Sequence, residues 1–179
     1  KALPWQSVPE FMAALRKHQG KSMAAFALEF AILTAARSGE VRGARWEELD
    51  LDARTWTVPA DRIKAGKPHQ VPLSDDAIAL LKRVPAMEGS PLVFTAPKGG
   101  QLSDMTLSAL LKRMQVNATV HGFRSSFKDW ARNATTYADE VSELALAHVN
   151  SDATRAAYAR DELLPQRAQL MADWAQFCR

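Results

Sequence analysis

The segment from Met23 to Ala36, MAAFALEFAILTAA, most constrains the fold of this chain. It is apolar on every side, with Glu29 and Thr34 as the polar exceptions. A helix that is hydrophobic all round is stable only when other elements surround it. The segment is also shorter than the roughly 18 apolar residues that a membrane-spanning helix needs. It therefore predicts a buried helix in the core of a globular domain.

The bulk composition is that of an ordinary globular domain. The 179 residues are enough for one well-buried core and few for two, and a mean hydropathy of −0.24 is unlike a membrane chain. Cys178 is the one cysteine, which excludes a disulfide framework and a cysteine-based metal site and fits a reducing cytoplasm. The chain begins at Lys1 with no signal-peptide pattern, so we expect a part of a longer cytoplasmic protein. The net charge of +3 is a mild basic bias, compatible with a polyanionic partner.

Periodicity and turn signals predict a mainly α-helical α+β fold with a small antiparallel β-hairpin in the N-terminal third. Short strands are expected at 55–58 and 69–73 around a turn-rich tip at 64–67, and the apolar triplet 92–94 is a candidate third strand. Helices are expected at 7–20, 22–35, 38–46, 74–83, 103–114, 121–133, 139–147, 151–160 and 165–177. No repeat, low-complexity tract or linker is visible, so residues 1–179 are expected to form one domain.

Several helix ends have sequence signatures of their own. Ser7 with Glu10 three residues later has the pattern of a capping box, and Gly20 is placed to close that first helix. Ser74 and Ser103 precede apolar periodic segments and are predicted N-caps. These residues set the expected boundaries of three helices.

Large aromatic side chains are expected to anchor the core, and the candidates are Trp46, Trp56, Trp130 and Trp174. In the last predicted helix, Leu170, Trp174 and Phe177 fall near one helical face. We expect this helix to fold back on its own domain.

Five residues in a fixed order carry the chemistry of the chain. Arg37 lies in AARSGE, His121 and Arg124 form a His-x-x-Arg in HGFR, and His148 precedes Tyr158 by ten positions. Two guanidinium groups can hold a phosphate, imidazoles can handle protons and hydrogen bonds, and a phenol can act as a covalent nucleophile. The set predicts phosphodiester transfer.

These residues resemble the catalytic domain of tyrosine recombinases, specifically the integrases of prophages and genomic islands, over nearly the whole chain. In that family a β-hairpin lysine precedes a VPL strand, here Lys64 before 71–73. Many members have Gly where Ala147 stands and Leu where Phe123 stands, and these departures indicate the genomic-island subgroup. The resemblance implies the catalytic set Arg37, Lys64, His121, Arg124, His148 and Tyr158.

The resemblance also implies partners and domains. Members of the tyrosine recombinase family cleave double-stranded DNA at attachment sites through a 3′-phosphotyrosyl intermediate and assemble as a tetramer on DNA. They normally place a core-binding domain, and often an arm-binding domain, N-terminal to the catalytic one, and both are expected to be absent from this chain. We therefore expect a monomeric catalytic fragment, with no membrane association.

The residue chemistry gives each member of the set a role. Arg37 and Arg124 are suited to clamp the phosphate, because a guanidinium group is always charged and reaches two oxygens at once. Glu40, one helical turn beyond Arg37, is expected to orient that arginine. His148 is expected to hydrogen-bond the phosphate. The cations are thus supplied by the protein, and no metal or cofactor is required.

Proton transfer is assigned to two further residues. Tyr158 has an unperturbed pKa of about 10, so its attack at neutral pH needs a proton acceptor. His121 is the predicted acceptor. The leaving 5′-oxygen needs a proton, which Lys64 at the hairpin tip is predicted to deliver as general acid.

Alternatives remain for four residues. Lys67 competes with Lys64 as the general acid, and Tyr137 is the other tyrosine of the chain. His69 is interpreted as a strand residue, with an approach to DNA as the alternative. His148 could also serve as a helix C-terminal residue, where its charge would suit the dipole.

Three other functions compete with recombination. A type IB topoisomerase uses related chemistry, and a DNA-binding module could have lost its chemistry, although the intact residue set argues against that loss. A metal-dependent nuclease would need clustered carboxylates, whereas 47–48 and 75–76 are typical of acids at helix starts. A chelator separates the last class, since it would silence a nuclease and leave a recombinase active.

Overall fold

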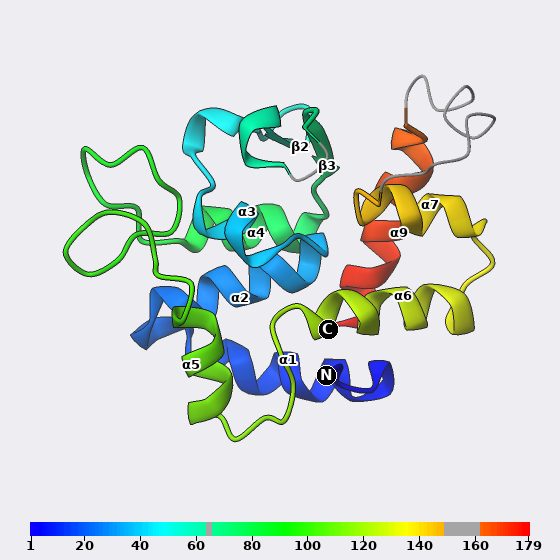
Figure 1. The fold of residues 1–179 in the computed structure, drawn as a ribbon, viewed down its shortest axis with the longest axis horizontal. Coiled ribbons are helices and arrows are strands. Elements are labelled where there is room, and N and C mark those ends of the chain that lie inside the picture. The colour runs from blue at the N-terminus through cyan, green and yellow to red at the C-terminus, as the bar shows by residue number, and fades with distance from the viewer. Residues whose placement is uncertain (64–65, 149–161) are drawn as a thin grey trace.

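The computed structural model describes residues 1–63, 66–148 and 162–179. The predicted helix at 151–160 and the predicted catalytic residues Lys64 and Tyr158 lie outside the described residues. The described part is mainly helical, with one small antiparallel sheet (Figure 1). Its α-helices are α1 (Val8–Arg16), α2 (Met23–Thr34), α3 (Ser38–Arg42), α4 (Asp75–Arg83), α5 (Thr106–Arg113), α6 (Gly122–Ala134), α7 (Asp139–Ala145) and α9 (Leu164–Phe177). The predicted α+β fold class is confirmed.

Helix α2 is the buried centre of the fold, as the sequence predicted. Every residue from Ala24 to Thr34 is buried, and α1, α3, α4, α5 and α9 all contact the helix (Figure 1). The helix begins where Ser22 Oγ accepts a hydrogen bond from the Ala24 amide at 3.1 Å. Its one acid, Glu29, receives a hydrogen bond from Arg16 Nε at 2.9 Å, and burial raises the pKa of that carboxyl group.

The sheet contains three short strands in the order β1-β2-β3. Strands β2 (Thr55–Val58) and β3 (His69–Pro72) form the predicted antiparallel hairpin, with Trp56 opposite Val71 and Val58 opposite His69. Alternation along β2 turns Trp56 and Val58 into the core.

The third strand is not the predicted triplet 92–94. It is β1 (Leu49–Asp50), which pairs with β2. Leu92 forms only an isolated bridge with Arg45, while Val93 is buried and its amide donates to Ala44 O at 2.9 Å. The apolar character of the triplet thus reflects burial in the core and not pairing in the sheet.

Two predicted caps are wrong and one is confirmed. Ser7 has helical backbone angles and closes a 3₁₀ turn, so its side chain caps nothing, and α1 ends at Arg16 before Gly20. Helix α5 begins at Thr106, whose hydroxyl pairs with that of Ser103, and not at Ser103 itself. Ser74 Oγ accepts from the Ala77 amide at 3.2 Å and caps α4 as predicted. The helix predicted at 38–46 is also shorter, since α3 ends before Gly43.

Helix α9 returns to the core, which confirms the predicted fold-back. It packs against α2, α4, α7 and β3, and both Leu170 and Trp174 are fully buried. Trp174 Nε1 donates to Ile32 O at 2.8 Å, and its ring lies 5.0 Å from that of Trp130. Of the four predicted tryptophan anchors, Trp56, Trp130 and Trp174 are buried, and Trp46 is only partly so.

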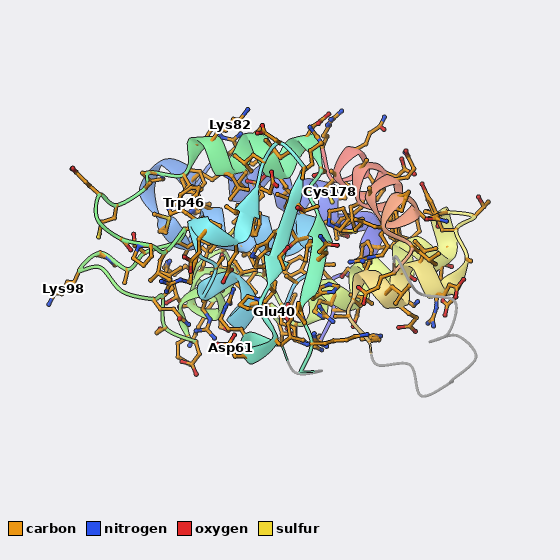
Figure 2. The ribbon with its side chains drawn as sticks, turned by 90° about the horizontal axis from the view of Figure 1, so that it is seen from above. Glu40, Trp46, Asp61, Lys82, Lys98 and Cys178 are labelled. Atoms are coloured by element: carbon orange, nitrogen blue, oxygen red, sulfur yellow. The ribbon has the colours of Figure 1, made fainter. Side chains whose placement is uncertain are left out.

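The C-terminal end of α9 places Cys178 in the interior (Figure 2). The thiol is buried, which raises its pKa. Among the described residues, no helix has the length and apolar character that crossing a bilayer requires.

Candidate active site

Arg37 is the N-cap residue of α3, directly after a reversal of the chain at the end of α2. Ala35 closes α2 in the left-handed region, with a φ of 54°. The Arg37 amide donates to Glu40 Oε1 at 3.0 Å, and Arg37 Nη1 donates to Glu40 Oε2 at 3.4 Å. Glu40 is buried while Arg37 is partly exposed, so the carboxylate holds the guanidinium group at the surface (Figure 2 labels Glu40). The predicted contact between these two residues is present.

Arg124 on α6 is the central residue of the site. Its side chain is buried, and Nη1 donates to Ala35 O at 2.5 Å while Nη2 donates to Leu146 O at 2.6 Å. Both carbonyls are at helix C-termini, of α2 and of α7, where the helix dipoles favour a cation. Burial, and then the charge of Arg37, lower the pKa of Arg124 to about 10, which leaves the group charged at neutral pH.

These two hydrogen bonds make Arg124 a positioning element for its neighbours. Ala35 lies two residues before Arg37, and Leu146 lies two residues before His148. The Arg124 guanidinium group therefore fixes the chain just ahead of two other predicted phosphate ligands. Two predicted site residues that are far apart in the sequence, Arg37 and His148, thus follow backbone that one buried group holds.

His148 follows α7 at an exposed position. Ala147 before it has a φ of 55°, in the left-handed region that glycine adopts without steric cost. The His148 amide donates to Glu143 O at 3.0 Å. His148 Nδ1 pairs with the Glu143 carboxylate, which also lies 3.5 Å from the buried Lys128 Nζ.

His121 is the residue before the first residue of α6, and its side chain is exposed. Partial desolvation of the ring, followed by the charges of Arg124, Arg37 and His148, lowers its pKa. A lowered pKa keeps the imidazole neutral at neutral pH, the form that can accept a proton. The structure thus brings Arg37, His121, Arg124 and His148 into one electrostatically coupled cluster.

The structure describes Tyr137 and Lys67, the alternatives to the predicted nucleophile and the predicted general acid. Tyr137, the other tyrosine, donates from its hydroxyl to Asp173 Oδ2 at 2.6 Å, and burial followed by Asp173 raises its pKa to about 12. That hydroxyl is bound to a carboxylate and is poorly suited to be a nucleophile. Lys67 Nζ lies 3.5 Å from Glu162 Oε1 at an exposed position.

His69 lies on β3, which confirms its interpretation as a strand residue, but its burial was not predicted. Its side chain is only 8% exposed. Burial, then the charges of Arg167, Arg124 and Arg37, lower the pKa of His69 to about 4. The signal was present in the period of two along β3, which turns His69 and Val71 inward and Gln70 outward.

The lowered pKa of the buried His69 predicts that the folded chain loses stability in acid. The unfolded histidine takes up a proton near its ordinary pKa of 6.5, whereas the folded one does so only near pH 4. Its contribution to the free energy of unfolding is therefore complete above pH 6.5 and falls as the pH drops toward 4, by about 2–3 kcal/mol. Urea unfolding at several pH values measures it.

The variant His69→Gln should be less dependent on pH in this window than the unsubstituted chain. His18→Gln, a substitution just after α1, serves as the control and should keep the full dependence. A slope for His69→Gln equal to that of the control would contradict a neutral buried His69.

Among residues 1–63, 66–148 and 162–179, no group of three or more His, Cys, Asp or Glu side chains is placed to hold a metal ion. The charged groups at the centre of the site are Arg37 and Arg124. Glu40 pairs with Arg37, and Glu143 pairs with His148.

Comparison with known proteins adds sequence relatives. Residues 1–163 match the model of the phage integrase family. The chain is 34% identical over 177 residues to prophage integrase IntA of Escherichia coli (strain K12), covering 96% of this chain and 43% of the relative. It is 31% identical over 196 residues to the integrase of Enterobacteria phage P4, covering 98% of this chain and 45% of the relative. The chain thus spans less than half the length of these relatives.

Solved structures share the fold. A lambda integrase(75–356) dimer bound to a COC′ core site matches with a TM-score of 0.63 at 19% identity, over 90% of this chain and 60% of that one. XerA recombinase matches with a TM-score of 0.58 at 14% identity, over 90% of this chain and 63% of that one. At these identities the likeness concerns the fold alone.

Proposed function

The chain belongs to the phage integrase family of tyrosine recombinases, and on that premise we propose that it is the catalytic domain of a site-specific DNA recombinase. It cleaves one DNA strand through a covalent 3′-phosphotyrosyl intermediate and then rejoins it to a partner strand, for integration or excision of a mobile element. The observation that carries the proposal is the cluster of Arg37 and Arg124 with two imidazoles, ordered by one buried guanidinium group.

The cluster suits a phosphodiester that gains negative charge as a fifth oxygen bonds to phosphorus. Arg37 is partly exposed and held in place by Glu40, so it can meet a phosphate oxygen without a large rearrangement. Arg124 donates through Nη1 and Nη2 to two helix-end carbonyls. Its positive charge still attracts the phosphate through space, and its remaining N–H groups can donate to it. Preorganised cations of this kind stabilise the transition state with little reorganisation.

Proton transfer completes the proposed reaction. Neutral His121 takes the proton of the Tyr158 phenol as its oxygen attacks phosphorus, and His148 donates a hydrogen bond to a non-bridging oxygen. The bond from phosphorus to the 5′-oxygen breaks, and Lys64 protonates that oxygen. Attack by the 5′-hydroxyl of another strand on the phosphotyrosine reverses these steps and releases Tyr158.

The whole protein extends the proposal to partners. We propose that residues 1–179 form one catalytic domain and that core-binding and arm-type DNA-binding domains precede it, which the greater length of the relatives supports. The DNA is double-stranded and carries attachment sites. A tetramer forms on it, in the cytoplasm. The assembly is supported by a fold shared with a lambda integrase tetramer bound to a Holliday junction, with a TM-score of 0.62 at 18% identity, over 84% of this chain and 47% of that one.

Covalent trapping tests the proposed function directly. A nicked suicide substrate loses the short 5′-hydroxyl fragment after cleavage, so the phosphotyrosyl adduct accumulates and is seen as a slower band on a denaturing gel. We expect the adduct in the presence of EDTA, on a substrate that carries the attachment site. Cleavage without an adduct, or cleavage lost on chelation, would indicate a nuclease instead.

Lys64→Ala is expected to slow cleavage of an ordinary substrate by about 10²–10⁴-fold, the range typical of general acid catalysis. A 5′-bridging phosphorothiolate should restore much of the rate, because its sulfur leaves without protonation. Lys67→Ala is the matched control, and it should show no such rescue. Rescue of Lys67→Ala instead would assign the role to Lys67.

DNA binding by the chain alone should be weak, mostly nonspecific and strongly dependent on salt. With a net charge of +3, only about 3–5 phosphate contacts are expected. Each contributes about −0.9 to the slope of log K against log salt, so affinity should fall roughly a hundredfold from about 50 to about 200 mM. Fluorescence anisotropy measures this fall. Nanomolar, site-selective binding near physiological salt would place the specificity determinants in this domain.

A further inference from the structure

Arg167, in the first turn of α9, is a buried cation outside the predicted catalytic set. Its side chain is only 1% exposed. Nη2 donates to Gln70 O on β3 at 2.5 Å, and Nη1 donates to Glu162 O at 3.4 Å. Nε is buried and has no hydrogen-bond partner in the part of the chain that the structure describes. A buried guanidinium group with an unmet donor is costly, so stability alone does not account for it.

Glu162 is held by cations from two different elements. Its Oε2 lies 3.8 Å from Arg167 Nη1, and its Oε1 lies 3.5 Å from Nζ of Lys67, in the turn between β2 and β3. Both Glu162 and Leu163 have φ near 50°, in the left-handed region that is unfavourable for their side chains. The contacts of Glu162 thus hold an unfavourable backbone conformation at the entry to α9.

Glu162 and Lys67, which form this ion pair, are close in sequence to the two predicted reacting groups. Glu162 is four residues after Tyr158, and Lys67 is three residues after Lys64. Gln70, which Arg167 also binds, lies on the strand that follows the Lys64 turn. One side chain of α9 therefore joins the chain after the nucleophile to the chain after the general acid.

We propose that Arg167 is a positioning residue for strand cleavage: it ties Glu162 to β3 and so holds together the two described segments that follow the proposed nucleophile and the proposed general acid in the chain. The proposal rests on the function proposed above. Attack on phosphorus needs the phenol and the leaving oxygen aligned, and a displacement of about 1 Å can lower a rate about 10²-fold. The exposed pair of Lys67 and Glu162 alone would give little rigidity. The buried bonds of Arg167 supply it.

The test compares Arg167→Met with a matched control, Arg16→Met. Arg16 also pins α9, at its other end, because Nη1 donates to Cys178 O at 3.4 Å while Nε binds Glu29. Both variants are expected to melt at a lower temperature than the unsubstituted chain. Only Arg167→Met should slow single-turnover cleavage of the suicide substrate, by about 10- to 100-fold. Its Kd for DNA should change by less than about threefold, since Arg167 is buried away from solvent.

Two further variants separate position from stability. Arg167→Lys keeps one charged donor, so it should recover part of the lost cleavage rate. Glu162→Gln keeps the backbone acceptor and removes the carboxylate, so it should slow cleavage by several-fold even if Arg167→Met does not fold. Glu47→Gln, an exposed acid paired with Arg45, is its control and should leave the rate unchanged.

The outcomes are distinguishable. No adduct from the unsubstituted chain would overturn the proposed function, and this inference with it. If the unsubstituted chain forms the adduct and Arg167→Met cleaves at an undiminished rate, the inference alone is overturned. Where Arg167→Met does not fold, an undiminished cleavage rate of Glu162→Gln overturns it. So would an equal loss of rate in Arg16→Met, because cleavage would then follow stability.

Discussion

Tyr158→Phe is expected to abolish the covalent adduct on a suicide substrate while leaving DNA affinity almost unchanged. The phenol oxygen is the proposed nucleophile, and phenylalanine has no atom that can bond to phosphorus. The phosphate contacts proposed for Arg37 and Arg124 remain, so binding is retained. The measurement is the adduct band after a long incubation, together with anisotropy on the same DNA.

Tyr137→Phe is the matched control, since it removes the chain's other phenol. Its hydroxyl binds Asp173, so the substitution should lower stability slightly and leave adduct formation intact. An adduct that persisted in Tyr158→Phe and vanished in Tyr137→Phe would reverse the assignment. In that case the contact between Tyr137 and Asp173 would have to open before reaction.

Arg124→Met should combine the second largest loss of activity with a large loss of stability. The carbonyls of Ala35 and Leu146 would lose their charged donor, and each buried unpaired carbonyl costs about 1–3 kcal/mol. The free energy of unfolding should therefore fall by roughly 2–6 kcal/mol. Loss of a preorganised charge lowers a rate by up to about 10³-fold and misplaced neighbours by about 10²-fold, so cleavage should fall by roughly 10⁵-fold.

Arg132→Met tests whether any arginine of α6 has this effect. Arg132 is exposed and pairs with Asp139 at 3.3 Å, so its loss should change the free energy of unfolding by less than about 1 kcal/mol. Cleavage should stay within a few-fold of the unsubstituted rate. Chemical unfolding and single-turnover cleavage of both variants check the contrast. Similar losses in the two would mean that the helix-end carbonyls are not the reason for Arg124's importance.

The sequence predicted the elements whose pattern is local. Helix α2 follows from its continuous apolar character, and the hairpin of β2 and β3 follows from two short strands around a turn. The order of Arg37, His121, Arg124 and His148 indicated the family, and the structure brings these four together. Their catalytic roles, with those of Lys64 and Tyr158, stay predictions.

The features that the sequence did not predict depend on distant partners. Arg124 binds a carbonyl that is 89 residues away in the chain, and Arg167 binds one that is 97 residues away. No local pattern distinguishes such a buried arginine from an exposed one. Ser7 fails as a cap for a local reason instead, because the 3₁₀ turn Trp5–Ser7 already gives it helical angles.

The burial of Cys178 has a practical consequence for studying motion in this protein. Alkylating reagents react with thiolates, and a buried thiol with a raised pKa should react only when the C-terminal end of α9 opens. The native chain should thus behave as cysteine-free toward maleimide dyes. A thiol introduced by Lys98→Cys, at an exposed loop tip (Figure 2), could then carry a fluorophore alone. The slow labelling of Cys178 itself would measure the rate at which the C-terminal end of α9 opens.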